Sequence, residues 1–74
     1  MPSGYQLRAA RSLIGWGQRR LAAAAKVDPT TIVRMESAGD KPVGGSAASL
    51  QAVLAALHKA GVEITADGVR LIKR

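Results

Sequence analysis

Cysteine and phenylalanine are both absent from this 74-residue chain, which has one tryptophan and one tyrosine. Without cysteine there is no disulfide framework, no thiolate zinc site and no cysteine nucleophile. Hydrophobic residues still make up 47% of the chain, so the core must consist of Ala, Leu, Val and Ile, which suits close-packed helices better than a large ligand cavity. A chain this short buries only about 60% of its unfolded surface. We therefore expect residues 1–74 to form a single domain whose small core favours association with a second copy.

Long hydrophobic runs and acidic residues are also scarce. Apolar stretches such as Leu21–Ala25 are far short of the roughly 20 residues that a membrane-spanning helix needs. The first residues show no apolar segment behind a basic end, so we expect a cytoplasmic protein without a secretory signal or membrane contact. Eleven Lys and Arg against five Asp and Glu give a formal net charge of +6. This charge favours polyanionic partners, nucleic acid before an anionic membrane surface.

Residues for catalysis are few. His58 is the sole histidine, and neither a cysteine nor a cluster of carboxylates accompanies it as a metal ligand or triad partner. Glu63 and Asp67 fall on a predicted hairpin, where Asp67-Gly68 has a sufficient conformational role as a turn. We therefore expect no enzymatic activity, no metal and no cofactor.

Hydrophobic spacing predicts two helices in the first third of the chain. The first runs from about Tyr5 to Ile14 and ends at Gly15, which can adopt a left-handed conformation without a Cβ clash. The second follows Gly17 and has high helix propensity throughout. Their expected inner faces consist of Leu7, Ala10, Leu13 and Ile14 in the first helix and Leu21, Ala22 and Ala25 in the second.

A third helix is predicted after Lys26-Val27. Asp28 is a strong N-cap residue, and Pro29 suits the first helical position because the missing N–H has no partner there. Ile32 and Met35 are expected to face inward, with Gly39 ending the helix.

The rest of the chain predicts a loop at 38–45, a fourth helix and a hairpin. Ser46 or Ser49 can cap the helix, and Gly61 can end it. Alternating residues on both sides of Asp67-Gly68 predict a β-hairpin over 62–73. The expected inner face of the fourth helix consists of Leu50, Val53, Leu54 and Leu57. The expected fold is therefore mainly α, with a helical core over residues 5–60 and a short C-terminal hairpin.

Residues 17–38 have the pattern of a helix-turn-helix. The second of two short helices approaches the first through small side chains and turns Thr30, Thr31 and Arg34 outward. Such slim or hydrogen-bonding groups fit a major groove about 12 Å wide. Arg34 is long enough to pair with guanine O6 and N7, which makes it the strongest candidate for reading sequence.

The segment RAARSLIGWGQRRLAAAAKVDPTTIVRMESAGDKP carries the pattern further. It resembles the lambda-repressor-like family of Cro/repressor and XRE-type helix-turn-helix proteins over roughly residues 6–58. This resemblance implies a four-helix domain that binds double-stranded DNA as a bacterial or phage transcriptional regulator, here interpreted as a repressor at the nucleoid. Two positions depart from the family: Lys26 stands where relatives usually carry glycine, and Gly17 where they commonly carry Ser or Thr.

The resemblance also implies individual roles. Gln18 contacts phosphate and helps to orient the recognition helix, here residues 28–37, while Arg11 and Glu36 form a structural ion pair. The base-facing positions are Pro29, Thr30, Thr31 and Arg34. From their charge and position, Arg19, Arg20 and Lys41 are further candidates for phosphate contact. Ordinary solvated surface residues are the alternative interpretation for the threonines and for these three cations.

Two questions stay open in the sequence. The same fold could serve as an antitoxin-like or anti-repressor-like protein-interaction module. An acidic or apolar recognition face would indicate that role, whereas residues 1–41 hold seven of the eleven basic residues and three of the five acidic ones. The hairpin could pair with a second copy to place two recognition helices about 34 Å apart, or it could simply cover the helical core.

Overall fold

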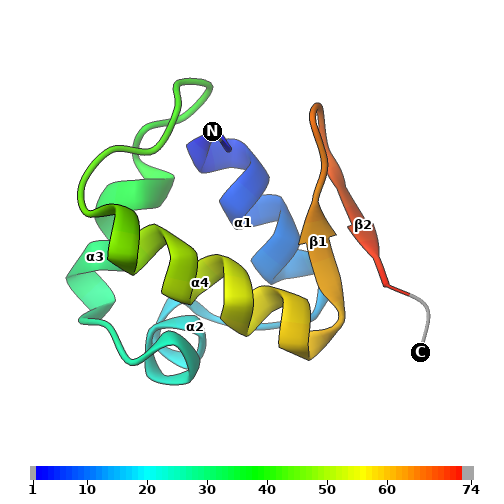
Figure 1. The fold of residues 1–74 in the computed structure, drawn as a ribbon, viewed down its shortest axis with the longest axis horizontal. Coiled ribbons are helices and arrows are strands. Elements are labelled where there is room, and N and C mark those ends of the chain that lie inside the picture. The colour runs from blue at the N-terminus through cyan, green and yellow to red at the C-terminus, as the bar shows by residue number, and fades with distance from the viewer. Residues whose placement is uncertain (1, 73–74) are drawn as a thin grey trace.

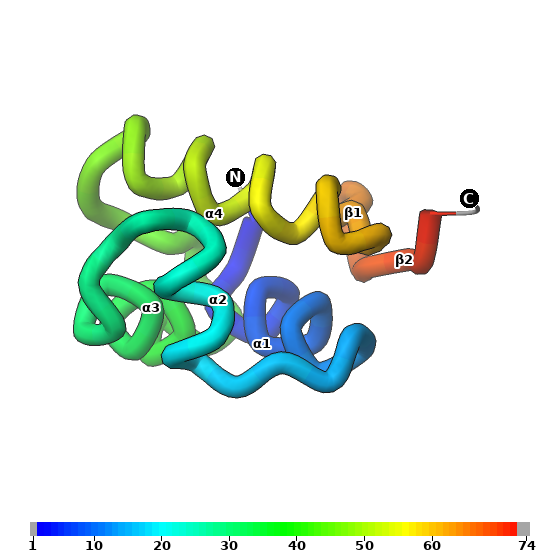
Figure 2. The backbone as a smooth tube through the Cα atoms, turned by 90° about the horizontal axis from the view of Figure 1, so that it is seen from below, coloured from blue at the N-terminus to red at the C-terminus, as the bar shows by residue number. Residues whose placement is uncertain are grey.

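Four helices and a C-terminal hairpin make up the computed structural model, which describes residues 2–72 (Figure 1). The elements are α1 (Gly4–Leu13), α2 (Gln18–Ala25), α3 (Pro29–Glu36), α4 (Ala47–Ala60), β1 (Val62–Ile64) and β2 (Val69–Leu71). The expected mainly α fold with a short hairpin is thereby confirmed. In both views α3 and β2 lie toward opposite ends of the molecule (Figures 1 and 2). No helix among the described residues combines the length and hydropathy needed to cross a bilayer.

Three of the four helices begin with a side-chain cap. Ser3 forms a capping box with Gln6 at α1, Asp28 accepts a 2.8 Å hydrogen bond from the Thr30 amide at α3, and Ser46, not Ser49, caps α4. Gly17 begins α2 without a side-chain hydrogen bond. The weaker start of α2 is thus compatible with the fold because packing supplies the rest of its stability.

One hydrophobic cluster joins all four helices and the hairpin. Its members are almost fully buried and are small or aliphatic, as the scarcity of aromatic residues requires. They are Leu7, Ala10, Leu21, Ala22, Ala25, Ile32, Met35, Val43, Leu50, Val53, Leu57 and Val62. The inner faces predicted for α2 and α3 are therefore confirmed, and Leu54 packs against the cluster while partly buried.

The turn between α2 and α3 depends on Lys26. This residue adopts a left-handed conformation (φ 58°, ψ 42°), the one non-glycine residue with positive φ between residues 2 and 72. Its amide donates to the carbonyls of Ala22 and Ala23, which closes α2. A residue with a Cβ pays about 1 kcal/mol for this conformation, which is the energetic consequence of lysine at a position where the resembled family usually carries glycine.

Leu13 was expected on the buried face of α1 but is 45% exposed. At 3.6 residues per turn it lies about 120° around the helix from Leu7, at the edge of the apolar stripe. Ile14, just past the helix end, packs against the core instead.

The end of α3 also differs from expectation. The helix stops at Glu36 with Ser37 as its C-cap, and Gly39 (φ 63°) lies in the following turn. This turn carries the chain back to α1, where the carbonyl of Gly39 accepts a 2.9 Å hydrogen bond from Tyr5 N–H. A helix leaves its first N–H groups unsatisfied, so the early end of α3 supplies a partner for the start of α1.

The hairpin pairs Val62 with Leu71, Glu63 with Arg70 and Ile64 with Val69. Its turn spans residues 65–68, wider than the predicted Asp67-Gly68, because Thr65 and Gly68 also bond to one another. Both strands pack against α1, and β1 also packs against α4. The hairpin thus covers part of the helical core, and Lys73, its predicted last residue, lies outside the described residues.

Candidate nucleic-acid interface

The outer face of α3 is a ridge of exposed side chains, hereafter the α3 crest: Thr30, Val33, Arg34 and Ser37. Ile32 and Met35 hold the opposite face of the helix in the core. Residues three and four apart share one side of a helix, so the four crest residues form one strip. Pro29 is exposed at the start of this strip.

Two hollows flank the α3 crest. The first lies toward α1 and α2, and the second lies toward the start of α4. The first is lined by Arg8, Arg11, Gln18, Val33, Glu36 and Ser37, and the second by Thr31, Arg34, Met35, Gly44, Gly45, Ser46 and Ser49. Thr31, predicted to face a base, is half-buried in the second hollow and does not stand on the crest.

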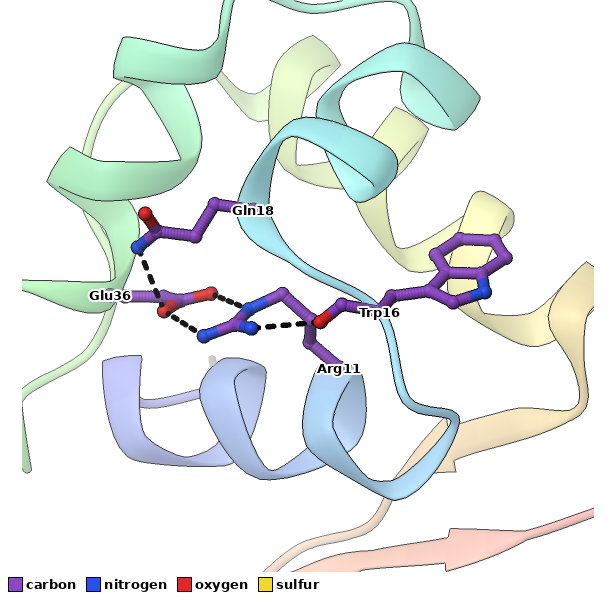
Figure 3. A network of polar contacts seen from close by, with 4 residues as sticks. All are labelled: Arg11, Trp16, Gln18 and Glu36. Carbon is purple, nitrogen blue, oxygen red and sulfur yellow. Dashed lines mark hydrogen bonds and ion pairs between the residues drawn. The ribbon is translucent and has the colours of Figure 1, made fainter.

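Arg11 and Glu36 form the ion pair that the family resemblance implied (Figure 3). The guanidinium donates two hydrogen bonds to the carboxylate, at 2.7 and 2.9 Å, and a third of 2.8 Å to the Trp16 carbonyl. The hydrogen-bonded carboxylate of Glu36 raises the pKa of Arg11, against a smaller opposing effect of burial. Only 15% of the Arg11 side chain and 6% of the Glu36 side chain are exposed. The pair therefore fixes α3 to the end of α1 from inside the molecule.

Gln18 joins the same network from the first residue of α2. Its side-chain amide donates a 3.2 Å hydrogen bond to Glu36 and reaches across to the end of α3 (Figure 3). The structure thus brings Gln18, Arg11 and Glu36 together beside the α3 crest. This contact links the start of α2 to the end of α3, and the role that the resemblance implied for Gln18 stays a prediction.

The three predicted phosphate-contacting cations lie in different surroundings. Arg19 is exposed next to Gln18, in the first turn of α2. Arg20 lies 4.9 Å from the centre of the Trp16 ring, and Figure 3 shows that ring turned away from Glu36. Lys41 is exposed in the loop after α3, where its carbonyl accepts from the Gly4 amide. Of the three, Arg19 is the one that directly adjoins the network at the crest.

Three residues of this surface were not singled out from the sequence. Arg8 lines the first hollow with Arg11, and Val33 and Ser37 complete the α3 crest. Arg8 lies three residues before Arg11, so it shares a face of α1 with the residue matched to Glu36. That spacing was the available signal for Arg8. Ser37 follows Arg34 by three residues within the predicted helix 28–37, so helix periodicity was the available signal there as well.

The charged groups of α3 are divided between its N-terminus, its outer face and its inner face. Arg34 is the one charged residue on the crest, since the carboxylate of Glu36 is turned inward to Arg11. Asp28 lies at the start of α3, where the hydrogen bond from the Thr30 amide holds the pKa of its carboxyl below the ordinary value. Its negative charge thus interacts with the helix N-terminus. Within residues 2–72, no three His, Asp or Glu side chains gather where they could hold a metal ion.

Comparison with known proteins adds no assignment to this geometry: no family model matches the chain, and no curated protein matches it significantly.

Proposed function

We propose that this protein is a sequence-specific double-stranded-DNA-binding regulator of transcription that inserts α3 into the major groove. The observation that carries the proposal is the difference between the outer and inner faces of α3. Its outer face is a narrow, exposed strip with a positive charge and no carboxylate, while a nearly buried ion pair and two core residues hold its inner face. A helix that reads bases needs both a slim outer face and a fixed orientation.

The proposed contacts divide into two classes. Arg34 pairs with guanine O6 and N7, worth roughly 1–3 kcal/mol of discrimination against other bases, and Thr30 contacts the neighbouring base. Pro29 and Thr31 flank this centre, with Thr31 reaching DNA from the second hollow. Phosphate contacts come from the side of the first hollow and fix position without reading sequence. Their candidates are Arg8, Gln18 and Arg19, with Arg20 and Lys41 as more distant cations.

The same surface argues against a protein partner as the primary ligand. An antitoxin-like or anti-repressor-like module would present an acidic or broadly apolar face, whereas the α3 crest has two hydroxyl groups, one arginine and one valine. Together with the net charge of +6, this composition favours DNA. We propose that this protein acts as a repressor, because a protein that occupies a promoter in this way keeps other proteins from the same site.

Selection of bound duplexes from random DNA at physiological salt tests the proposal. We expect the wild-type protein to enrich one short motif and Arg34→Ala to lose its preference at a guanine of that motif. Arg70→Ala is the control, since it removes another exposed arginine, from the hairpin. Absence of any enriched motif contradicts the proposal, and equal weakening of Arg34→Ala on every duplex makes Arg34 a phosphate contact.

We propose further that two copies associate through the outer edge of β2. In an antiparallel pair, alternate residues turn their N–H and C=O groups away from the partner strand. The Ile72 amide donates to the Gly61 carbonyl, which fixes the register of the two strands. In this register the backbone N–H and C=O groups of Val69 and Leu71 point away from β1, toward the outer side of β2. The Leu71 side chain is 61% exposed. An unprotected edge of this kind is a template for another strand, and a second copy offers the same edge under two-fold symmetry.

Sedimentation at micromolar concentration tests this association. Wild-type protein is expected to sediment as a dimer, and Leu71→Lys as a folded monomer because a charge on the edge opposes pairing. A wild-type monomer, with and without DNA, contradicts the dimer and leaves the hairpin with the single role of covering the core.

A further inference from the structure

We propose that Val33 reads the 5-methyl group of a pyrimidine beside the guanine read by Arg34, so that the preferred site contains a thymine next to that guanine. The inference rests on the proposed DNA-binding function and names the sequence feature that the α3 crest selects.

Val33 stands out because the fold makes little use of its side chain. It is 47% exposed, and the other three residues of the α3 crest are polar. It belongs neither to the buried core nor to the partly buried residues that pack against it. Valine also has lower helix propensity than alanine or the long polar residues. Neither packing nor helix formation therefore accounts for an isopropyl group at this position.

The position of Val33 places it with the groups already proposed to read bases. Thr30 lies three residues before Val33 and four residues before Arg34. Residues at these spacings are neighbours on a helix surface, so the three side chains form one patch. Val33 and Arg34 are adjacent in sequence and separated by about 1.5 Å along the helix axis. Base pairs are stacked about 3.4 Å apart. Two such neighbours can therefore address adjacent base pairs.

The chemistry of the major groove limits what a valine can recognise. Every base edge there offers hydrogen-bonding groups, and thymine alone among the four bases adds an apolar group, the C5 methyl. The valine side chain has no donor or acceptor, so contact with that methyl is the one favourable interaction it can make. Its branching at Cβ leaves one strongly preferred rotamer in a helix. The isopropyl group is therefore already ordered before DNA binds.

A substitution in the DNA isolates this contact. In the duplex selected by the wild-type protein, each thymine is replaced in turn by deoxyuridine, which removes the methyl and leaves base pairing intact. Affinity is measured by fluorescence anisotropy for the wild type and for Val33→Ala. We expect one deoxyuridine, next to the guanine that depends on Arg34, to weaken wild-type binding about fourfold, the value of one buried methyl. Val33→Ala should bind both duplexes nearly equally.

Two controls sharpen the result. Leu13→Ala removes an apolar side chain of similar exposure, 45% against 47% for Val33, from α1 outside both hollows, and should keep the full sensitivity to deoxyuridine. Replacing the same T·A pair by a C·G pair should weaken binding, and 5-methylcytosine at that position should restore part of the affinity.

The possible failures are distinct. If no duplex is enriched by the wild-type protein, the DNA-binding function itself is wrong. If a motif is enriched but has no thymine beside the guanine, the assignment of Val33 is overturned while the function stands. The same holds if deoxyuridine weakens wild type and Val33→Ala equally.

Discussion

Polar contacts stabilise two regions of the molecule in different ways: the network of Arg11, Trp16, Gln18 and Glu36 beside α3, here called the joint, and the C-terminal hairpin. At the joint, the ion pair between Arg11 and Glu36 is nearly buried, and further hydrogen bonds to α2 and the preceding loop complete the network. In the hairpin, the ion pair between Glu63 and Arg70 is much more exposed, with 32% and 68% of the two side chains open to solvent. Buried pairs are costly to break, whereas exposed pairs contribute little. The ion pair beside α3 therefore contributes more to stability than the ion pair of the hairpin.

The sharpest test of this contrast removes one charge from each pair. Glu36→Gln leaves the Arg11 guanidinium buried beside a neutral amide and should lower the free energy of unfolding by about 3 kcal/mol. Glu63→Gln makes the same chemical change in the hairpin and should cost no more than about 1 kcal/mol. Urea unfolding measures both. Equal losses would show that the two regions are tied with equal strength.

Backbone contact at the joint gives a second, smaller effect. A Cβ on Gly4 would lie 2.6 Å from the Glu36 carbonyl oxygen and 2.7 Å from backbone atoms of Met35 and Gly39. Gly4→Ala must push α1 away from the end of α3, and we expect a loss of about 2 kcal/mol in urea unfolding. Gly44→Ala is the control because a Cβ there meets nothing within 4 Å. Equal stability of the two variants would refute the close approach of α1 and α3.

Side-chain hydrogen bonds from Gln6 connect the hairpin turn to α1. Its amide nitrogen donates to the carbonyls of Thr65 and Gly68, at 2.9 and 3.2 Å, while its oxygen completes the capping box of α1. Gln6→Glu keeps the cap but sets a carboxylate against two carbonyls, so we expect a loss of about 1–2 kcal/mol. Hydrogen exchange should quicken in residues 62–72 more than in α3. The exposed Gln51→Glu on α4 is the control, and unchanged exchange in the hairpin would contradict this role.

The smallest effect concerns acid and the cap of α3. Hydrogen bonding to the Thr30 amide lowers the pKa of Asp28 from its ordinary value of 3.8. The stabilisation is therefore fully present above that value and is lost as pH falls through the lower pKa of the folded state. Asp28→Asn keeps an acceptor that does not titrate, so its urea midpoint should fall less between pH 7 and pH 2.5 than that of the wild type. Identical falls would remove Asp28 from the acid response.

Local signals in the sequence account for much of the fold. Asp28-Pro29 marks the start of α3, Gly61 the end of α4, and the apolar spacing identifies most buried positions. Each of these depends on neighbours within about one helical turn, so the pattern is contained in a short window. The predicted burial of Leu13 was wrong because a short window of sequence does not show how far a neighbouring element extends over a helix.

Contacts between distant residues are the part that local pattern does not contain. Gln6 and Thr65 are 59 positions apart, and nothing around either residue marks the other. The close approach at Gly4 likewise depends on where the end of α3 lies. The ion pair of Arg11 and Glu36 was expected only through the family resemblance. Of the α3 crest, Arg34 and Thr30 followed from helix periodicity, whereas the neighbouring Arg8 came to light through the hollow it shares with Gln18.

The central claim is that the α3 crest is the surface that reads double-stranded DNA. Its most direct test is titration of ¹⁵N-labelled protein with the selected duplex, followed by amide chemical shifts, with a scrambled duplex of equal length as control. If the α3 crest binds DNA, the largest specific changes fall on residues 30–37, with smaller ones at Arg8, Gln18 and Arg19. Changes concentrated in residues 62–72 or around Trp16, with α3 unaffected, would contradict it.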